Sequence, residues 1–164
     1  MAVSLDEIDV RLLRELETDA DRPNVELARI VGLSPAATLN RVRRMKEAGV
    51  IRRIAARLDS ATAGFSLQVY LLVTLARHDT AAERRFNEEV AALDNVIAAD
   101  TVAGETDALL MIVARDVAEL HVVLSRLSTR GGAQRLITLL RLAELKPASP
   151  LPLRATSVQS RRAS

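Results

Sequence analysis

The spacing of apolar residues changes near Asp59, and this change constrains the fold more than any other feature of the chain. Before it, apolar residues recur three and four positions apart, at Leu5, Ile8, Leu12 and Leu16. That spacing is typical of one buried helix face, whereas the alternation over residues 65–75 is typical of a strand with one buried face. The 164 residues can form one domain or two small ones. We predict a helical domain over residues 1–60, an α+β domain over 61–146 and a flexible tail over 147–164.

The first sixty residues carry the start and stop signals of three helices. Ser4 and Glu7 fit a capping box before a helix that ends near residue 18. Asn24 fits the N-cap of a short second helix, and Gly32 fits its end. Ser34 and Pro35 then restart a helix over residues 35–48. Two helices separated by about three residues that include a glycine indicate a helix-turn-helix.

The third of these helices has one apolar and one polar face when its residues are placed at about 100° intervals. Leu39, Val42 and Met45 share the face that we expect to be buried. The opposite face carries small, amide and basic side chains: Ala36, Ala37, Asn40 and Arg44, flanked by Arg41 and Arg43. Small residues allow close approach to a major groove, where asparagine reads adenine and arginine reads guanine or holds phosphate. Residues 50–54 predict a short wing strand with Arg52 and Arg53 pointing outward.

Charge is distributed unevenly, although the whole chain carries only +2. Residues 1–28 contain three arginines and eight carboxylates, a net charge of −5. Residues 41–57 contain seven basic side chains and one glutamate, a net charge of +6. Such a basic block is expected of a nucleic-acid contact. A solvated helix face is the alternative, and for Arg52 and Arg53 the charge pattern alone does not decide between the two.

The second domain predicts the order βαββαβ. A helix follows the capping pair Thr80 and Glu83, and another follows Asp116 and buries Val117, Leu120, Leu124 and Leu127. Apolar runs over residues 96–103 and 107–114 meet at Gly104-Glu105, which suits a type II′ hairpin turn. A last strand spans about residues 135–145. This order is typical of a ferredoxin-like fold, with helices on one face of an antiparallel sheet.

The segment ALLMIVA, residues 108–114, is apolar at successive positions and so predicts a strand that is apolar on both faces. Helices on one side of the sheet would leave its other face open, so we expect a second copy of the chain to cover it. From Pro147 onward the chain is rich in Pro, Ser, Ala and Arg without periodicity, which predicts the flexible tail.

Several classes of function are disfavoured. The chain has no cysteine, so it has no thiolate nucleophile and no cysteine zinc site. His78 and His121 lack metal-ligand spacing and a suggested catalytic partner, so we expect no catalytic residue, no metal and no cofactor. No apolar stretch reaches the length of about 20 residues that spans a bilayer, and the N-terminus does not read as a signal peptide. We expect a cytoplasmic protein.

Three segments in order resemble the Lrp/AsnC family of feast/famine regulators: LDEIDVRLLREL, NVELARIVGLSPAATLNRVRRMKEAGVI and LDSATAG. The resemblance runs from Leu5 to about Pro147. It implies a winged helix-turn-helix that binds double-stranded operator DNA, with Ser34, Asn40, Arg41 and Arg44 on or beside the DNA face. It also implies a nucleoid-associated protein whose second domain dimerises, assembles into octamers or related rings, and senses amino acids.

The resemblance further implies an effector site between dimers, at the turn Gly104, Glu105, Thr106 and Asp107 and at Thr138 of the last strand. A carboxylate there can pair with the effector's ammonium group, and the N–H groups of a tight turn can hold its carboxylate. Alternatively, Gly104 and Asp107 only shape and cap the turn. Ala108 departs from the family, in which many members carry an aromatic residue at this position.

The expected function is therefore a sequence-specific DNA-binding regulator modulated by a small amino acid. A sirohaem-decarboxylase-like enzyme is similar over both domains, but the histidine- and aromatic-rich motif that such an enzyme needs is missing here. A DNA architectural protein without an effector is the third alternative.

Overall fold

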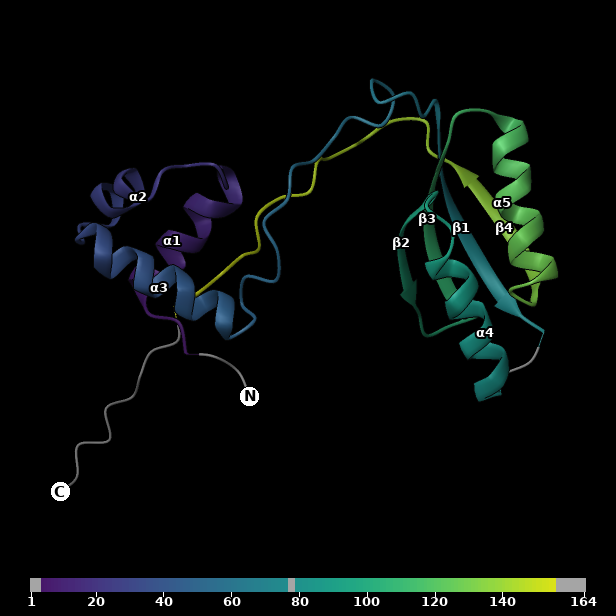
Figure 1. The fold of residues 1–164 in the computed structure, drawn as a ribbon, viewed down its shortest axis with the longest axis horizontal. Helices are drawn as coiled ribbons and strands as arrows, with labels where there is room; N and C mark the ends of the chain where they lie inside the picture. The colour runs from purple at the N-terminus through teal and green to yellow at the C-terminus, as the bar shows by residue number, and fades with distance from the viewer. Residues whose placement is uncertain (1–3, 77–78, 156–164) are drawn as a thin grey trace. The chain divides into compact units, whose positions relative to one another are not determined.

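The computed structural model describes residues 4–76 and 79–155 (Figure 1). The chain forms two compact units. The first contains the residues up to Arg57 and those from Lys146 onward, and the second is Leu58–Leu145. Each unit has its own cluster of buried apolar side chains. His78 lies outside the described residues, as do Arg161 and Arg162 of the predicted tail.

The first unit contains the predicted helix-turn-helix. Its helices are α1 (Glu7–Thr18), α2 (Asn24–Val31) and α3 (Pro35–Glu47), and their shared core includes Leu12, Leu27, Val42 and Met45. Gly32 ends α2 in the left-handed conformation, with φ 73°, which glycine adopts without a steric penalty. Ser34 then caps α3, because its Oγ accepts the N–H of Ala37 at 3.2 Å. These features confirm the predicted turn between α2 and α3.

Three predicted helix caps are wrong by one or two residues. The capping box of α1 joins Asp6 and Asp9, not Ser4 and Glu7: Asp6 Oδ1 accepts the N–H of Asp9 at 2.8 Å, and Asp9 Oδ2 accepts that of Asp6 at 3.3 Å. Asn24 is the first residue of α2 rather than its cap. Its side chain instead donates to the carbonyl of Pro35 at 2.9 Å, which ties the two helices of the motif together. Asp79, rather than Thr80, caps α4.

The buried face of α3 differs from the predicted one. Leu39 is 55% exposed, whereas Thr38, Val42 and Met45 are buried. The interior therefore accepts a small threonine, whose hydroxyl donates to the carbonyl of Ser34.

The predicted wing strand over residues 50–54 does not form. The N–H groups of Val50 and Ile51 both donate to the carbonyl of Met45, at 2.9 and 3.2 Å, and so close the end of α3. Both side chains then pack against the helical core instead of alternating along a strand.

The second unit is an antiparallel sheet in the order β2-β3-β1-β4. Its elements are β1 (Leu67–Leu75), α4 (Thr80–Ala91), β2 (Val96–Thr101), β3 (Ala108–Ala114), α5 (Val117–Thr129) and β4 (Ala133–Leu140). Both helices cover one face (Figure 1), where Phe86 of α4 and Leu127 of α5 pack on Leu71 and Val73 of β1. The predicted ferredoxin-like arrangement is confirmed.

Several details of this unit were predicted wrongly. Val117 is 72% exposed, and Val123 takes the place expected of it in the core. The last strand ends at Leu140, not at residue 145. Six residues, not two, connect β2 to β3, and the connection closes where the N–H of Val102 donates to the carbonyl of Asp107 at 3.1 Å. Gly104 lies in this connection at φ 146°, outside the range of a type II′ turn.

The chain after β4 has neither helix nor strand as far as residue 155, the last that the structure describes. The expectation of a free tail is nevertheless wrong for part of it, because Leu153 packs against the core of the first unit. Within residues 4–76 and 79–155, no helix is both long enough and apolar enough to span a membrane.

Candidate nucleic-acid interface and effector site

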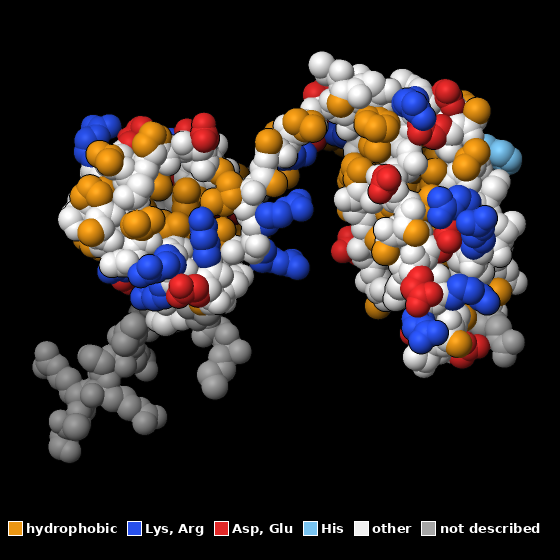
Figure 2. All heavy atoms as spheres, in the orientation of Figure 1, with side chains coloured by type: hydrophobic (Ala, Val, Ile, Leu, Met, Phe, Trp, Pro, Cys, Tyr) orange, Lys and Arg blue, Asp and Glu red, His pale blue; other side chains and the backbone are white. Residues whose placement is uncertain are grey.

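The exposed side of α3 is basic. Figure 2 shows lysine and arginine side chains along the part of the first unit that carries α3. Ala36, Asn40, Arg43 and Arg44 are exposed, whereas Ala37 and Arg41 are half-buried. Arg43 Nη2 donates to Asn40 Oδ1 at 3.0 Å, so these two side chains lie together on the surface. The structure thus brings together most of the predicted recognition residues on one accessible side of the helix.

A buried carboxylate holds two of the arginines that the sequence assigns to the DNA face. Asp9 is only 1% exposed, and its two oxygens accept hydrogen bonds from α3. Arg41 Nη1 donates to Asp9 Oδ1 at 2.9 Å and to Asp6 Oδ2 at 2.6 Å, while Arg44 Nη2 donates to Asp9 Oδ2. A buried charge without such partners would be costly. The Asp9 cluster, composed of Asp6, Asp9, Arg41 and Arg44, therefore clamps α1 to α3.

Asp6 makes part of this clamp sensitive to acid. The N–H of Asp9, and then the Arg41 guanidinium, hold the pKa of Asp6 below its ordinary value of 3.8. A lowered carboxyl pKa stabilises the fold above the ordinary value, and the stabilisation disappears as the pH falls through the lowered one. We expect Asp6→Asn to be less stable than the wild type at pH 7, and the difference to shrink as the pH falls below the ordinary pKa of 3.8 and through the lowered one. Urea unfolding over this range, monitored by circular dichroism, checks this, and a stability difference independent of pH would contradict it.

Arg52 and Arg53 lie on the exposed segment that follows α3. Neither has a salt bridge to a described carboxylate in the structure, so both charges face solvent. Their position agrees with a phosphate contact beside a recognition helix.

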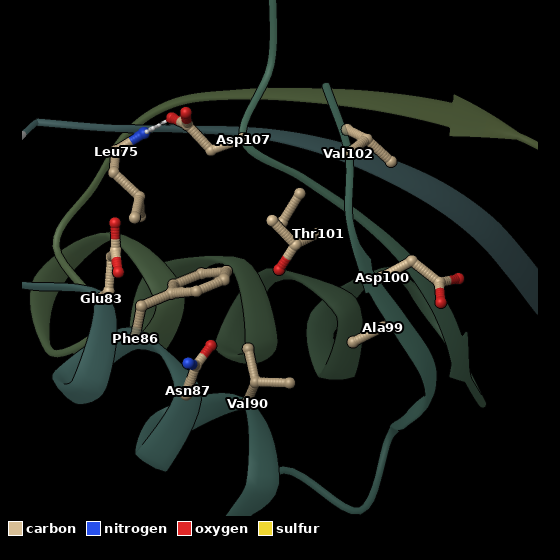
Figure 3. Close-up of a pocket in the computed structure, with 11 residues that line it drawn as sticks. Leu75, Glu83, Phe86, Asn87, Val90, Ala99, Asp100, Thr101, Val102 and Asp107 are labelled. Carbon is tan, nitrogen blue, oxygen red and sulfur yellow. Dashed lines mark hydrogen bonds between the residues drawn. The ribbon is translucent and has the colours of Figure 1, made fainter. Parts of the chain in front are cut away.

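The second unit has a cavity of about 230 Å³ between α4 and β2 (Figure 3). Glu83, Phe86, Asn87 and Val90 of α4 form one wall of this α4–β2 cavity. The other wall consists of residues from the strands and their connections: Leu75, Ala99, Asp100, Thr101, Val102, Asp107 and Ala108. The cavity therefore combines an apolar floor with carboxylates, an amide and a hydroxyl.

Of the five predicted effector residues, Asp107 alone lines this cavity. Its N–H donates to the carbonyl of Val73 at 2.8 Å. Its Oδ2 accepts the N–H of Leu75, also at 2.8 Å (Figure 3). Asp107 therefore caps the end of β1. Gly104, Glu105 and Thr106 lie in the β2–β3 connection, outside the cavity lining. Thr138 of β4 pairs with Leu71 of β1, and β4 lies on the opposite side of β1 from β3.

The α4 wall of the cavity was not predicted from the sequence. In the sequence, Glu83 fits a capping residue, and Asn87 interrupts no apolar stripe. The available signal was their spacing of four, which places both on the side of the helix that also carries Phe86 and Val90. No group of three or more potential metal ligands occurs in the described part of the chain.

A helix-turn-helix with an exposed basic helix, joined to an α+β unit that contains a small cavity, defines the class of DNA-binding proteins with a separate second domain. Comparison with known proteins supports this definition. The AsnC-type helix-turn-helix family matches residues 5–46, and the Lrp/AsnC ligand-binding domain family matches residues 68–151. The chain belongs to the Lrp/AsnC family of DNA-binding transcriptional regulators.

Three relatives illustrate the match. The leucine-responsive regulatory protein of Rhizobium meliloti is 37% identical over 89% of this chain and 94% of its own length. A Neisseria meningitidis transcriptional regulator, solved in complex with L-methionine, superposes with a TM-score of 0.84 at 31% identity, over 91% of this chain and 97% of that one. A feast or famine regulatory protein from M. tuberculosis, also complexed with L-methionine, gives a TM-score of 0.78 at 28% identity, over 87% and 95%. All three are named as regulators, and none as a sirohaem decarboxylase.

Proposed function

We propose that α3 enters the major groove of operator DNA with Asn40, Arg43 and Arg44 toward the bases. The observation that carries this proposal is the exposed basic side of a helix in the second position of a helix-turn-helix. Ser34, Ala36 and Ala37 at the start of α3 allow close approach, and Arg52 and Arg53 supply phosphate contacts. Electrophoretic mobility shifts on the DNA upstream of the protein's own gene test it, and equal binding to competitor DNA would refute it.

We infer that the DNA-binding form is at least a dimer. The sheet face opposite α4 and α5 carries apolar side chains on three neighbouring strands: Tyr70, Leu72, Leu109, Met111, Ile137 and Leu139. Most are half-buried, and Leu139 is 48% exposed. A second copy would remove this apolar face from water. Two recognition helices would then meet successive major grooves about 34 Å apart on a roughly palindromic operator, and dimers could assemble further into rings.

Leu139→Glu should break this dimer, because a carboxylate would be buried in an apolar interface. We expect dimerisation to weaken by about 2 kcal/mol or more, roughly 30-fold. Sedimentation velocity at several protein concentrations measures the change. Val122→Glu, on the exposed side of α5, is the matched control and should remain dimeric. If both variants behave as the wild type, the sheet face is not the interface.

We propose that the α4–β2 cavity binds the amino-acid effector. The volume of about 230 Å³ lies below the range of roughly 300–1,000 Å³ that holds drug-sized ligands. Glu83 and Asp107 can attract an ammonium group, while the Asn87 amide and the Thr101 hydroxyl can donate to a carboxylate. Phe86 and Val90 offer an apolar surface to a side chain. The L-methionine complexes of the two relatives support an amino acid as the ligand class.

Glu83→Gln should reduce the thermal stabilisation that the preferred amino acid provides at a given concentration. A ligand that binds only the folded protein raises its stability by mass action, so a screen of the twenty amino acids by thermal shift identifies the effector. We expect the affinity to fall about tenfold when one charged hydrogen bond is removed. Glu105→Gln is the matched control, since Glu105 lies in the predicted turn but outside the cavity. The reverse pattern would place the effector at the turn, and no stabilisation by any amino acid would favour the architectural alternative.

A further inference from the structure

The C-terminal segment returns to the DNA-binding unit after the second unit is complete. Residues from Lys146 onward group with the first unit, although they follow β4 in the chain (Figure 1). The leucines before and after the return differ in exposure. Leu142 and Leu145, before the return, are exposed, whereas Leu153 packs against the cluster that contains Leu12 and Met45. Within the returning segment, Leu153 is half-buried, whereas Leu151 is 64% exposed.

Two side chains of α1 fix the main chain of the same segment. Arg14 Nη2 donates to the carbonyl of Leu153 at 3.0 Å, and Glu17 Oε1 accepts the N–H of Leu151 at 3.1 Å. Between them, the N–H of Leu153 donates to the carbonyl of Leu151 at 2.7 Å across Pro152. A donor and an acceptor spaced about one helical turn apart on α1 thus match an acceptor and a donor of the segment. These hydrogen bonds fix both the position of the C-terminal segment on α1 and its register along the helix.

A groove lies between the C-terminal segment and the basic residues that follow α3. Leu151 and Leu153 line it together with Leu13, Leu16, Ile51, Arg52, Arg53 and Ile54. Residues 52–54 have no strand partner, since the predicted wing does not form. Leu153 packs against the same buried cluster as Val50 and Ile51, the two residues that directly precede Arg52.

We propose that residues 151–153 form a strap that docks on the helix-turn-helix of its own chain and holds the Arg52–Arg53 stretch in place for DNA binding. The C-terminal strap is then a component of the DNA-binding surface. Its effect on DNA affinity rests on the proposed phosphate contacts of Arg52 and Arg53. The docking of the strap does not depend on those phosphate contacts. Docking and DNA affinity are therefore tested by separate measurements.

Chemical cross-linking tests the docking. The chain has no cysteine, so two introduced cysteines report on each other alone. Leu153→Cys combined with Leu16→Cys should join within one chain when treated with a short bismaleimide, at least tenfold faster than Leu145→Cys combined with Leu16→Cys. Equal rates would overturn the strap. Cross-links exclusively between chains would also overturn it, because the groove would then be filled by a second copy.

Operator binding tests the consequence. Leu153→Asp should release the strap, accelerate tryptic cleavage after Arg154 and weaken operator binding about tenfold, while Leu145→Asp should change neither. Arg14→Ala removes one anchor without altering the core and should act in the same direction if Leu153→Asp fails to fold. A released strap with unchanged affinity would overturn the proposed role. If Arg52→Ala also leaves affinity unchanged while the cross-link forms, the phosphate contacts have failed and the docking stands.

Discussion

Replacing Asp9 by alanine is expected to lower the free energy of unfolding of the first unit by about 2–3 kcal/mol. Asp9 is almost fully buried and accepts hydrogen bonds from Arg41 and Arg44 of α3. Its removal would leave the charge of Arg41 partly buried with Asp6 as its remaining partner. The arginine side chains are 27% and 53% exposed, so water can partly replace the carboxylate. The cost therefore falls below that of a fully buried pair.

Urea unfolding followed by circular dichroism measures this decrease, and Glu7→Ala is the matched control. Glu7 lies in the same first turn of α1 but is exposed, so its removal should cost less than about 1 kcal/mol through the helix dipole. Equal decreases in the two variants would show that Asp9 acts only as a first-turn charge. Asp9→Asn should fall between them, because it keeps the shape and removes the charge.

Replacing Arg44 by alanine is expected to weaken operator binding by about tenfold to a hundredfold, which corresponds to the removal of a single bidentate arginine–guanine pair. Arg44 is the more exposed of the two arginines in the Asp9 cluster, so it can leave Asp9 for a guanine or a phosphate while Arg41 keeps the carboxylate paired. Arg41→Ala should affect mainly the stability of the fold. It should lower stability more than Arg44→Ala does, because Arg41 bridges Asp6 and Asp9.

Fluorescence anisotropy with labelled operator, at several salt concentrations, separates phosphate binding from base recognition. If Arg52 binds a phosphate, Arg52→Ala should reduce the slope of log affinity against log salt by about one and weaken binding equally on all sequences. If Arg44 reads a base, Arg44→Ala should reduce the preference for operator over competitor DNA. If Arg44→Ala destabilises the fold as Asp9→Ala does and leaves affinity unchanged, Arg44 is a structural partner of Asp9 alone.

The sequence predicts most of the architecture because its apolar patterns are regular. The helix-turn-helix follows from Gly32, Ser34 and Pro35, whose local conformations depend little on the rest of the fold. The βαββαβ order follows from alternation in β1 and from Asp116, which caps α5 as predicted. These elements are set by interactions between near neighbours in sequence.

The features that the sequence predicts wrongly or misses depend on interactions between residues far apart in the chain, which a local pattern does not reveal. Leu39 and Thr38 are neighbours on α3, and the packing of the three helices buries Thr38 and leaves Leu39 exposed. Asp9 looks like any other carboxylate of an acidic helix until Arg41 and Arg44 are brought to it. The cavity wall from α4 and the docked Leu153 likewise join segments far apart in the chain.

The return of the C-terminal segment makes the second unit an insertion within the first. Exchanging effector specificity between relatives therefore requires two junctions, after Arg57 and before Lys146, rather than one. A chimera with a single junction would combine the recognition helix of one protein with the C-terminal segment of another. Recombination between family members would be expected to preserve both flanks together.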